Sequence, residues 1–392
     1  MVHFSRTTHI GRVTEDGMKV LLLTCGEPGN KSNVYQALAN ALSLRNVICE
    51  TLDVSAILGP VSDAERTLFS STAVRTTRAF DFLYQPASFS PAGRKKSPIY
   101  DINNTFILRF EAYLNEQNFD AVITTALYPA EAMTYLKHKR DIRAKGFFVV
   151  TDYMSVPFLE ETDMELIFLP EQSLVPAFVK RGIPAEKMDP SGIPVPEKYC
   201  YRTERGSARL SLELSPDIPT YLLIGGTEGL SDPMTVARKI LERSKGRDCR
   251  IVVITGRNAT LGDALRRRFE GDPRVLSIPF EQQVSMYMDA CDVMVASPSA
   301  IRLTAAAVKG TPTIYLPSEN APENVNAQFF ADRGMAIFSS TPDLAADNAV
   351  RLASDPDQCA RMKQAMRQYI PDDAADHVSD RVMMACPDLV AG

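Results

Sequence analysis

Short apolar runs alternate with segments of helical composition through the first half of the chain. Four runs of strand character occupy residues 19–24, 47–52, 119–125 and 145–151. Turns with polar or glycine residues adjoin these runs, and residues 33–44 have the composition of a helix. Continuous apolar runs bounded by turns are typical of buried parallel strands, and their alternation with helices is typical of βαβ units. The pattern therefore predicts a Rossmann-like domain in the first half.

A second alternation of the same kind begins at residue 220. Strand and turn signals occupy 220–229, 250–258, 275–280, 293–296 and 313–316, with helical segments at 234–244, 284–290 and 300–308. Polar residues flanked by prolines separate the two halves, and residues 355–385 read as terminal helices broken at Pro371. We therefore expect an α/β protein with a lead-in at 1–18, domains at 19–196 and 220–370, a linker at 197–219 and a terminal helix within 371–392.

The stretch from Asp292 to Pro317 carries the strongest chemical signal. It reads as strand, tight turn, helix, turn and strand, with Ser299 as a plausible N-cap and Gly310 at the end of the helix. Such a unit directs free backbone N–H groups and the positive end of the helix toward its first loop, which suits a phosphate group. Any doubly wound protein contains a unit of this kind, so the stretch alone leaves its function open.

Composition removes several classes of function. The formal net charge of -5 argues against a general nucleic-acid binder, which would have a basic surplus. Seven scattered cysteines without metal-ligand spacing indicate a reducing compartment and no structural zinc. No apolar run reaches the roughly 18 residues that a membrane span needs. The first 18 residues lack the apolar region of a secretory signal, so we expect a cytoplasmic protein.

The central stretch also resembles the donor-site segment of a glycosyltransferase family. This family contains the monogalactosyldiacylglycerol synthases and the processive diacylglycerol glucosyltransferases. Its pattern is matched by Asp292, Pro298, Ala306, Gly310 and Pro312. Four substitutions depart from it: Ser299 and Ala300 stand in place of two glycines, Arg302 in place of a threonine, and Ala305 in place of the glutamate that binds the nucleotide ribose.

Further matches extend the resemblance over roughly residues 19–353. They include the R-G-I-P-x-E-K element within 164–188, the G-R-N turn at 256–258 and part of the P-G-Q-E-x-x-N-A element within 318–330. The resemblance implies the GT-B architecture, in which two Rossmann-like domains face each other across a cleft. It also implies that the last helix packs back on the first domain.

Donor-binding residues follow from the same resemblance. It implies that glycine turns meet the donor phosphates, that a loop near residue 280 contacts uracil, and that the Q-E pair of the 318–330 element binds the donor sugar. Glu323 matches this glutamate, while Pro322 stands in place of the glutamine. The implied donor-binding residues are Gly225, Gly226, Gly256, Arg257, Asn258, Phe280, Ser297, Ser299, Ala300, Arg302, Glu323 and Asn326.

The catalytic base is harder to assign. None of the four histidines lies at the position of the histidine considered catalytic in the family, and Lys31 stands there instead. Lys31 would act as a base only with a strongly depressed pKa. Asp152 follows a strand in a V-T-D-Y element that resembles the family, and Glu27 is the other carboxylate expected near the cleft. Alternatively, Asp152 caps the following turn.

We therefore expect a metal-independent transferase that moves a hexose from a nucleotide-sugar to a lipid or other small acceptor. The resemblance implies a UDP-sugar as the donor. We expect no cofactor besides this donor. A catalytically degenerate scaffold that binds a nucleotide, glycolipid or protein partner is the alternative, and a nucleotide-sugar epimerase is a more distant one. Arg94, Lys95 and Lys96 suit peripheral contact with an anionic membrane at its inner face, although a solvated loop is the favoured interpretation of this cluster.

Overall fold

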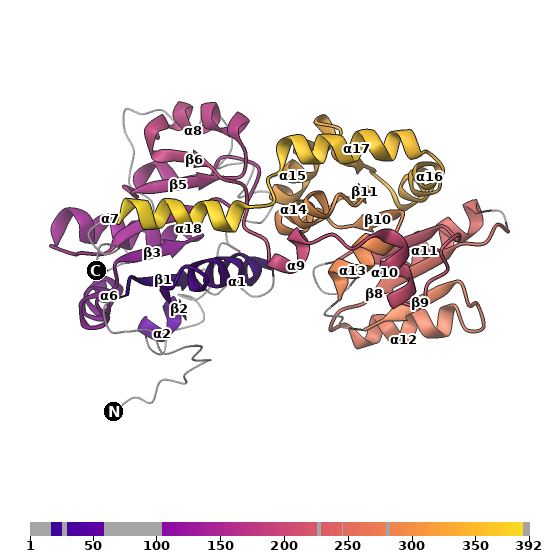
Figure 1. Cartoon of the computed structure of the whole chain (residues 1–392), viewed down its shortest axis with the longest axis horizontal. Helices are drawn as coiled ribbons and strands as arrows, with labels where there is room; N and C mark the ends of the chain where they lie inside the picture. The colour runs from indigo at the N-terminus through magenta and orange to yellow at the C-terminus, as the bar shows by residue number, and fades with distance from the viewer. Residues whose placement is uncertain are drawn as a thin grey trace.

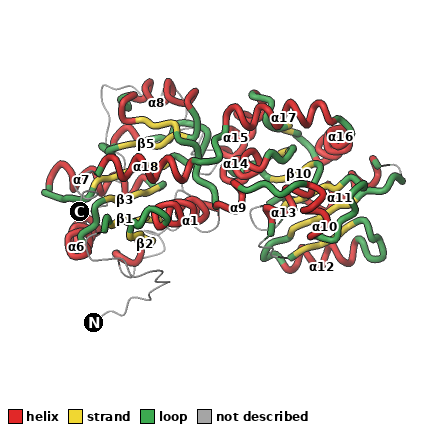
Figure 2. The backbone as a smooth tube through the Cα atoms, in the orientation of Figure 1, coloured by secondary structure: helices red, strands yellow, loops and turns green. Residues whose placement is uncertain are grey.

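Two α/β domains lie side by side in the computed structural model (Figure 1). The structure describes residues 17–25, 30–58, 104–225, 229–244, 246–279 and 283–386. Each domain holds one six-stranded sheet whose strands are all parallel. The strands run through the middle of each domain, with helices on both faces (Figure 2). This confirms the predicted fold class.

The sheet of the first domain has the order β2-β1-β3-β4-β5-β6. Its strands are β1 (Lys19–Thr24), β2 (Ile48–Asp53), β3 (Ala121–Thr124), β4 (Lys145–Val149), β5 (Leu166–Leu169) and β6 (Met188–Pro190). The helices include α1 (Asn30–Ser43), α2 (Val54–Leu58), α6 (Asn104–Gln117), α7 (Leu127–Lys139) and α8 (Val175–Arg181). Leu21, Leu22 and Leu23 are all fully buried because helices cover both faces of the sheet, which explains the continuous apolar run.

The sheet of the second domain has the order β12-β11-β10-β7-β8-β9. Its strands are β7 (Thr220–Ile224), β8 (Arg250–Ile254), β9 (Val275–Ile278), β10 (Val293–Ala296), β11 (Thr313–Tyr315) and β12 (Ile337–Phe338). The helices are α11 (Pro233–Arg243), α12 (Ala259–Arg268), α13 (Val284–Ala290), α14 (Ala300–Lys309), α15 (Ala321–Asp332), α16 (Pro342–Ala353) and α17 (Pro356–Tyr369).

Both sheets have a point at which the strand order reverses. In the first domain it lies between β1 and β3, and in the second it lies between β7 and β10. Open parallel sheets bind ligands outside the carboxyl ends of the strands at such switch points. The loop between β10 and α14 is therefore placed where a ligand of the second domain would sit.

Residues 197–219 contain two short helices, α9 (Glu197–Cys200) and α10 (Arg205–Ser211). The fully buried side chain of Arg209 donates to Asp292 Oδ2 over 2.7 Å and to the carbonyl of Ala290 over 2.9 Å. Arg202 donates to the carbonyl of Val308 at the end of α14. These bonds hold the second part of this connection on the second domain.

The chain returns to the first domain through α18 (Ala374–Ala385), drawn in yellow in Figure 1. Arg45 after α1 pairs with Asp380 over 2.6 Å, and Arg381 pairs with Asp189 of β6 over 2.6 Å. These ion pairs attach α18 to the end of α1 and to the edge strand β6.

The two connections between the domains pack against each other at Gly192. Its φ of +88° lies in the region that side chains rarely adopt, and a Cβ there would approach Pro371 Cγ to 2.5 Å. Glycine is therefore required at this position for two independent reasons.

Candidate active site between the two domains

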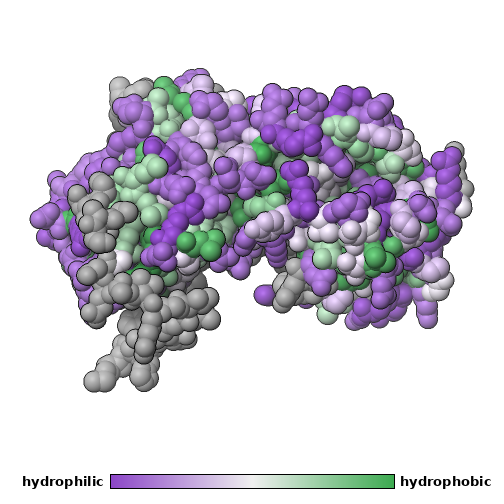
Figure 3. Space-filling model, in the orientation of Figure 1, coloured by the Kyte–Doolittle hydropathy of each residue, from purple (hydrophilic) through white to green (hydrophobic). Residues whose placement is uncertain are grey.

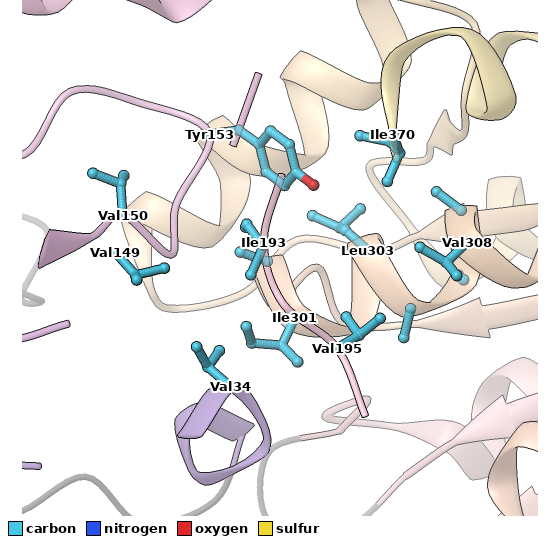
Figure 4. Close-up of a cluster of buried hydrophobic side chains, with 14 of the residues drawn as sticks. Val34, Val149, Val150, Tyr153, Ile193, Val195, Ile301, Leu303, Val308 and Ile370 are labelled. Atoms are coloured by element: carbon cyan, nitrogen blue, oxygen red, sulfur yellow. The ribbon is translucent and has the colours of Figure 1, made fainter. Parts of the chain in front are cut away.

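Apolar side chains from both domains form one buried cluster at their junction (Figure 4). Val34 of α1 and Val149 of β4 come from the first domain, and Ile301 and Leu303 of α14 come from the second. All four are at most 5% exposed. Because α1 follows β1 and α14 follows β10, each helix begins at a switch point, and contact between the two helices sets the two switch points face to face.

The start of α14 has the electrostatics of an anion site. The first-turn N–H groups of a helix lack intrahelical acceptors, and the helix dipole adds partial positive charge there. Arg302, in that first turn, donates to the carbonyl of Ser297 over 2.9 Å and also bonds its hydroxyl. The guanidinium therefore lies at the loop between β10 and α14. Ser297, Ser299 and Ala300 are all buried in this loop.

Asp152 follows β4 and contacts the second domain. Asn326 of α15 donates from Nδ2 to Asp152 Oδ1 over 2.8 Å, and its Oδ1 accepts the backbone N–H of Tyr153 over 2.7 Å. A backbone N–H only donates, so the amide oxygen of Asn326 must face Tyr153 and its NH₂ group must face the carboxylate. The orientation of Asn326 is thus set by the bonds that it makes.

Tyr153 inserts its ring into the second domain. Its ring centroid lies 4.9 Å from that of Phe329 and 4.8 Å from that of Phe330, the latter edge-on. Its hydroxyl lies 2.7 Å from Thr304 Oγ1, which itself donates to the carbonyl of Ala300 over 2.8 Å. Thr304 has one proton to give, so the tyrosine donates to the threonine. Burial raises the pKa of Tyr153 above its usual range, which keeps this donor protonated.

These four residues, Asp152, Tyr153, Thr304 and Asn326, form what we call the clasp. Three of them are buried and Asp152 is half-buried. The clasp joins the carboxyl end of β4 to α14 and α15, one helical turn from the start of α14. It brings the predicted carboxylate and the predicted phosphate loop into one region of the molecule.

The predicted role of Asn326 changes in the light of this geometry. The resemblance placed Asn326 among the donor-binding residues. Its side chain is fully buried, and both ends of its amide bond the first domain. Asn326 therefore has no exposed surface with which to contact a sugar in this arrangement.

A second group of predicted residues lies at the carboxyl ends of β7 and β8. We call Gly225, Gly256, Arg257 and Asn258 the open rim. Gly256 adopts a φ of +58°, Arg257 is exposed, and Asn258 caps α12 by accepting the N–H of Leu261 over 2.9 Å. A Cβ at Gly225 would approach the carbonyl of Ile254 to 3.3 Å, so its absence lets the two loops pack closely.

Glu323 lies half-buried in the first turn of α15. The loop before it is closed by Asn324, whose side chain accepts the N–H of Ser318 over 2.9 Å and donates to its carbonyl over 2.8 Å. This paired bond fixes the loop that presents Glu323. The sequence signal for it was an asparagine six residues after a serine, which the family pattern does not mark.

Several predicted positions lie outside the described residues. They are Glu27, Gly226, Phe280, Arg94, Lys95 and Lys96. The backbone of Lys31 lies in the first turn of α1, and its side chain is not described. Of the three predicted catalytic side chains, Asp152 is the one that the described structure places.

Tyr153 and Thr304 were missed as site residues. Tyr153 was visible in the V-T-D-Y element, where it appeared only as a match to a pattern. Thr304 appeared as one more position in a helix-forming run. Their bond joins residues 151 positions apart, and no local signal in the sequence encodes such a pairing.

Two facing Rossmann-like domains, with switch points opposed across a junction, define the GT-B class of proteins. Family models divide the chain in the same way. Residues 32–195 match the model described as monogalactosyldiacylglycerol (MGDG) synthase, and residues 220–376 match the glycosyltransferase family 28 C-terminal domain. Both matches support a place for the chain among the GT-B glycosyltransferases related to the MGDG synthases and the processive diacylglycerol glucosyltransferases.

Individual proteins support the same assignment. The processive diacylglycerol beta-glucosyltransferase of Staphylococcus saprophyticus is 26% identical over 248 residues, which is 63% of this chain and 62% of that protein. The chain thus aligns with less than two thirds of that relative. The structure of Acinetobacter baumannii MurG matches with a TM-score of 0.63 at 15% identity, covering 94% of this chain and 99% of MurG.

A complex of Staphylococcus aureus MnaA with UDP matches with a TM-score of 0.60 at 10% identity, covering 96% of this chain and 98% of MnaA. At these identities, the two structures support the fold alone. Among the residues that the structure describes, no helix has the length and apolar character to cross a membrane.

Proposed function

We propose that this protein transfers a hexose from a nucleotide-sugar, a UDP-sugar, to a lipid acceptor of the diacylglycerol type. The observation that carries the proposal is the chain of contacts from Asp152 to α14: its neighbour Tyr153 bonds Thr304, which bonds the carbonyl of Ala300 at the start of that helix. Arg302 and the helix dipole provide positive charge there. The names of the relatives support the substrate classes, because one transfers glucose to diacylglycerol and a protein of the same fold was solved with UDP.

The nucleotide would bind along the carboxyl edge of the second sheet. The diphosphate suits the loop from Ser297 to Ala300, with Arg302 as an additional cation. Adjacent strands lie about 4.8 Å apart, so the open rim at β7 and β8 begins one strand away from β10. Arg257 is exposed there and suits a further polar contact with the nucleotide. Glu323, in the first turn of α15, suits a hydroxyl of the sugar.

The reaction would be an inverting displacement. Asp152 takes the proton of the acceptor hydroxyl as its oxygen attacks the anomeric carbon. The bond between that carbon and the diphosphate oxygen breaks, and its electron pair leaves with the diphosphate. The N–H groups at the start of α14 and the guanidinium of Arg302 stabilise the charge that develops on this leaving group.

A binding protein without transferase activity is the second candidate. The family's ribose-binding glutamate is replaced by Ala305, which is buried in α14 and has no polar group to offer. This substitution favours weaker or altered recognition of the nucleoside.

Contact of Arg94, Lys95 and Lys96 with a membrane and the cytoplasmic location stay predictions.

A transfer assay separates the two candidates. Labelled UDP-glucose and UDP-galactose are incubated with the full chain and vesicles that contain diacylglycerol, and the label in the lipid fraction is measured. Transfer above the level of a heat-inactivated control is the expected result. Binding of UDP without transfer from any UDP-hexose would favour the binding protein.

A further inference from the structure

The clasp connects the proposed base to the second domain through the side chain of Asn326. We infer that Asn326 is a positioning residue: it orients the carboxylate of Asp152 only while the two domains are closed on each other. This inference rests on the proposed function for its catalytic half. Its structural half, the joining of the domains by the amide of Asn326, stands on the hydrogen bonds alone.

Geometry distinguishes Asn326 from an ordinary interface residue. Its two bonds go to adjacent residues of the first domain, one to the backbone N–H of Tyr153 and one to the carboxylate of Asp152. The first bond sets the direction of the amide, because the oxygen must accept from the N–H. The second bond then presents an N–H to one oxygen of the carboxylate and fixes how the carboxylate turns.

Burial makes this orientation dependent on closure. Asn326 and Thr304 are fully buried and Tyr153 is only 2% exposed while the two domains are in contact. Separating the domains would break the bonds that Asn326 and Thr304 make with the first domain. The carboxylate of Asp152 would then lose the hydrogen bond donated by Asn326. A base held in this way is oriented when the donor loop and the acceptor domain are together, which is when transfer can occur.

Tyr153 supplies a matched control. Its hydroxyl makes an interdomain bond of similar length to Thr304, and this bond does not involve Asp152. In Tyr153→Phe that bond is lost while Thr304 keeps the carbonyl of Ala300 as its acceptor. The variant thus removes one interdomain hydrogen bond without leaving a buried donor unpaired.

The first experiment tests the joining of the domains and needs no substrate. Melting temperature and small-angle X-ray scattering are measured for the wild-type chain, Asn326→Asp, and the exchange variant D152N/N326D. Asn326→Asp sets two carboxylates against each other, so the melting temperature should fall by at least about 2 °C and the radius of gyration should rise. In the exchange variant the amide and the carboxylate change places, and both values should return to those of the wild-type chain. A failure of the exchange variant to recover would overturn this half of the inference.

The second experiment tests positioning by turnover. Asn326→Ala should lower kcat by about 100-fold, as misplacement of a catalytic group does, with a smaller change in KM for the UDP-sugar. Tyr153→Phe should lower kcat by less than about threefold, because it weakens closure without touching the base. Equal losses of kcat in these two variants would show that Asn326 acts only as an anchor.

The exchange variant also separates this inference from the proposed function. It should regain stability while remaining inactive, because its carboxylate now belongs to the second domain. If the wild-type chain transfers no sugar, the proposed function fails and the positioning of a base fails with it. The stability and scattering results would still decide whether Asn326 joins the domains.

Discussion

The clasp and the open rim hold their polar groups in opposite ways. In the clasp, side chains are buried and bond across the domains, as Asn326 does with Asp152. On the open rim, Arg257 is exposed and the side chain of Asn258 caps the helix that follows it. The buried clasp suits orientation of a reacting group, and the exposed Arg257 suits contact with a ligand. Figure 3 shows an indentation at the lower edge of the molecule, where the two domains meet.

The largest effect should come from Asp152→Asn. The amide keeps an oxygen that accepts from Asn326, so the clasp and the stability should change little. The proton acceptor is lost, and kcat should fall by about 10²–10⁴-fold. Steady-state turnover, together with a melting curve, measures both quantities. Unchanged turnover would remove Asp152 from catalysis and leave the clasp as a structural feature.

Gly192→Ala should disturb the packing between the two connections that join the domains. Its Cβ would collide with Pro371, and a φ of +88° disfavours any side chain, so we expect a loss of about 3 kcal/mol in the free energy of unfolding. Gly182→Ala is the matched control. Gly182 has a φ of +101° with no atom within 4 Å of the added Cβ, so its loss should be about 1 kcal/mol. Denaturant unfolding of both variants measures the difference, and equal losses would show that the contact with Pro371 is unimportant.

Arg302→Met tests the charge at the start of α14. Removing the guanidinium should weaken binding of UDP by about tenfold, because a charge-assisted contact with the diphosphate is lost. Binding of uridine should be unaffected. Titration calorimetry with both ligands checks this. A parallel loss for uridine would mean that the substitution disturbs the loop rather than the phosphate contact.

The smallest effect should come from Arg257→Ala on the open rim. The side chain is exposed, so the melting temperature should stay within about 1 °C of the wild-type value. Binding of UDP should weaken by no more than about threefold, because water screens a contact between the exposed guanidinium and the nucleotide. A large loss of stability would show that the rim is part of the core and would blur its difference from the clasp.

Local patterns in the sequence predicted much of the fold. The helix expected at 300–308 is α14 at Ala300–Lys309, because helix formers, Gly310 and Pro312 all mark its limits. The tract at 197–219 was expected to be a linker, yet it contains α9 and α10. Arg209 can be buried there because it forms an ion pair with Asp292, 83 residues later in the chain. The polar composition of the tract does not reveal this pairing.

The site was predictable in its parts but not in its assembly. Asp152, the α14 loop and Asn326 were each identified from short motifs in separate segments. Their meeting depends on a bond between residues 174 positions apart and on the packing of two domains. Motifs report which residues a family uses, while the direction of a side chain depends on tertiary contacts. For this reason, the sequence placed Asn326 among the donor-binding residues, whereas in the structure its amide bonds Asp152 and Tyr153.

A calorimetric titration of the wild-type chain with UDP, with uridine and other nucleoside diphosphates as controls, tests the central claim most directly. The account predicts saturable binding of UDP that is much tighter than binding of uridine, because the diphosphate meets the start of α14 and Arg302. Equal binding of UDP and uridine, or no binding of either, would contradict a donor site at this loop.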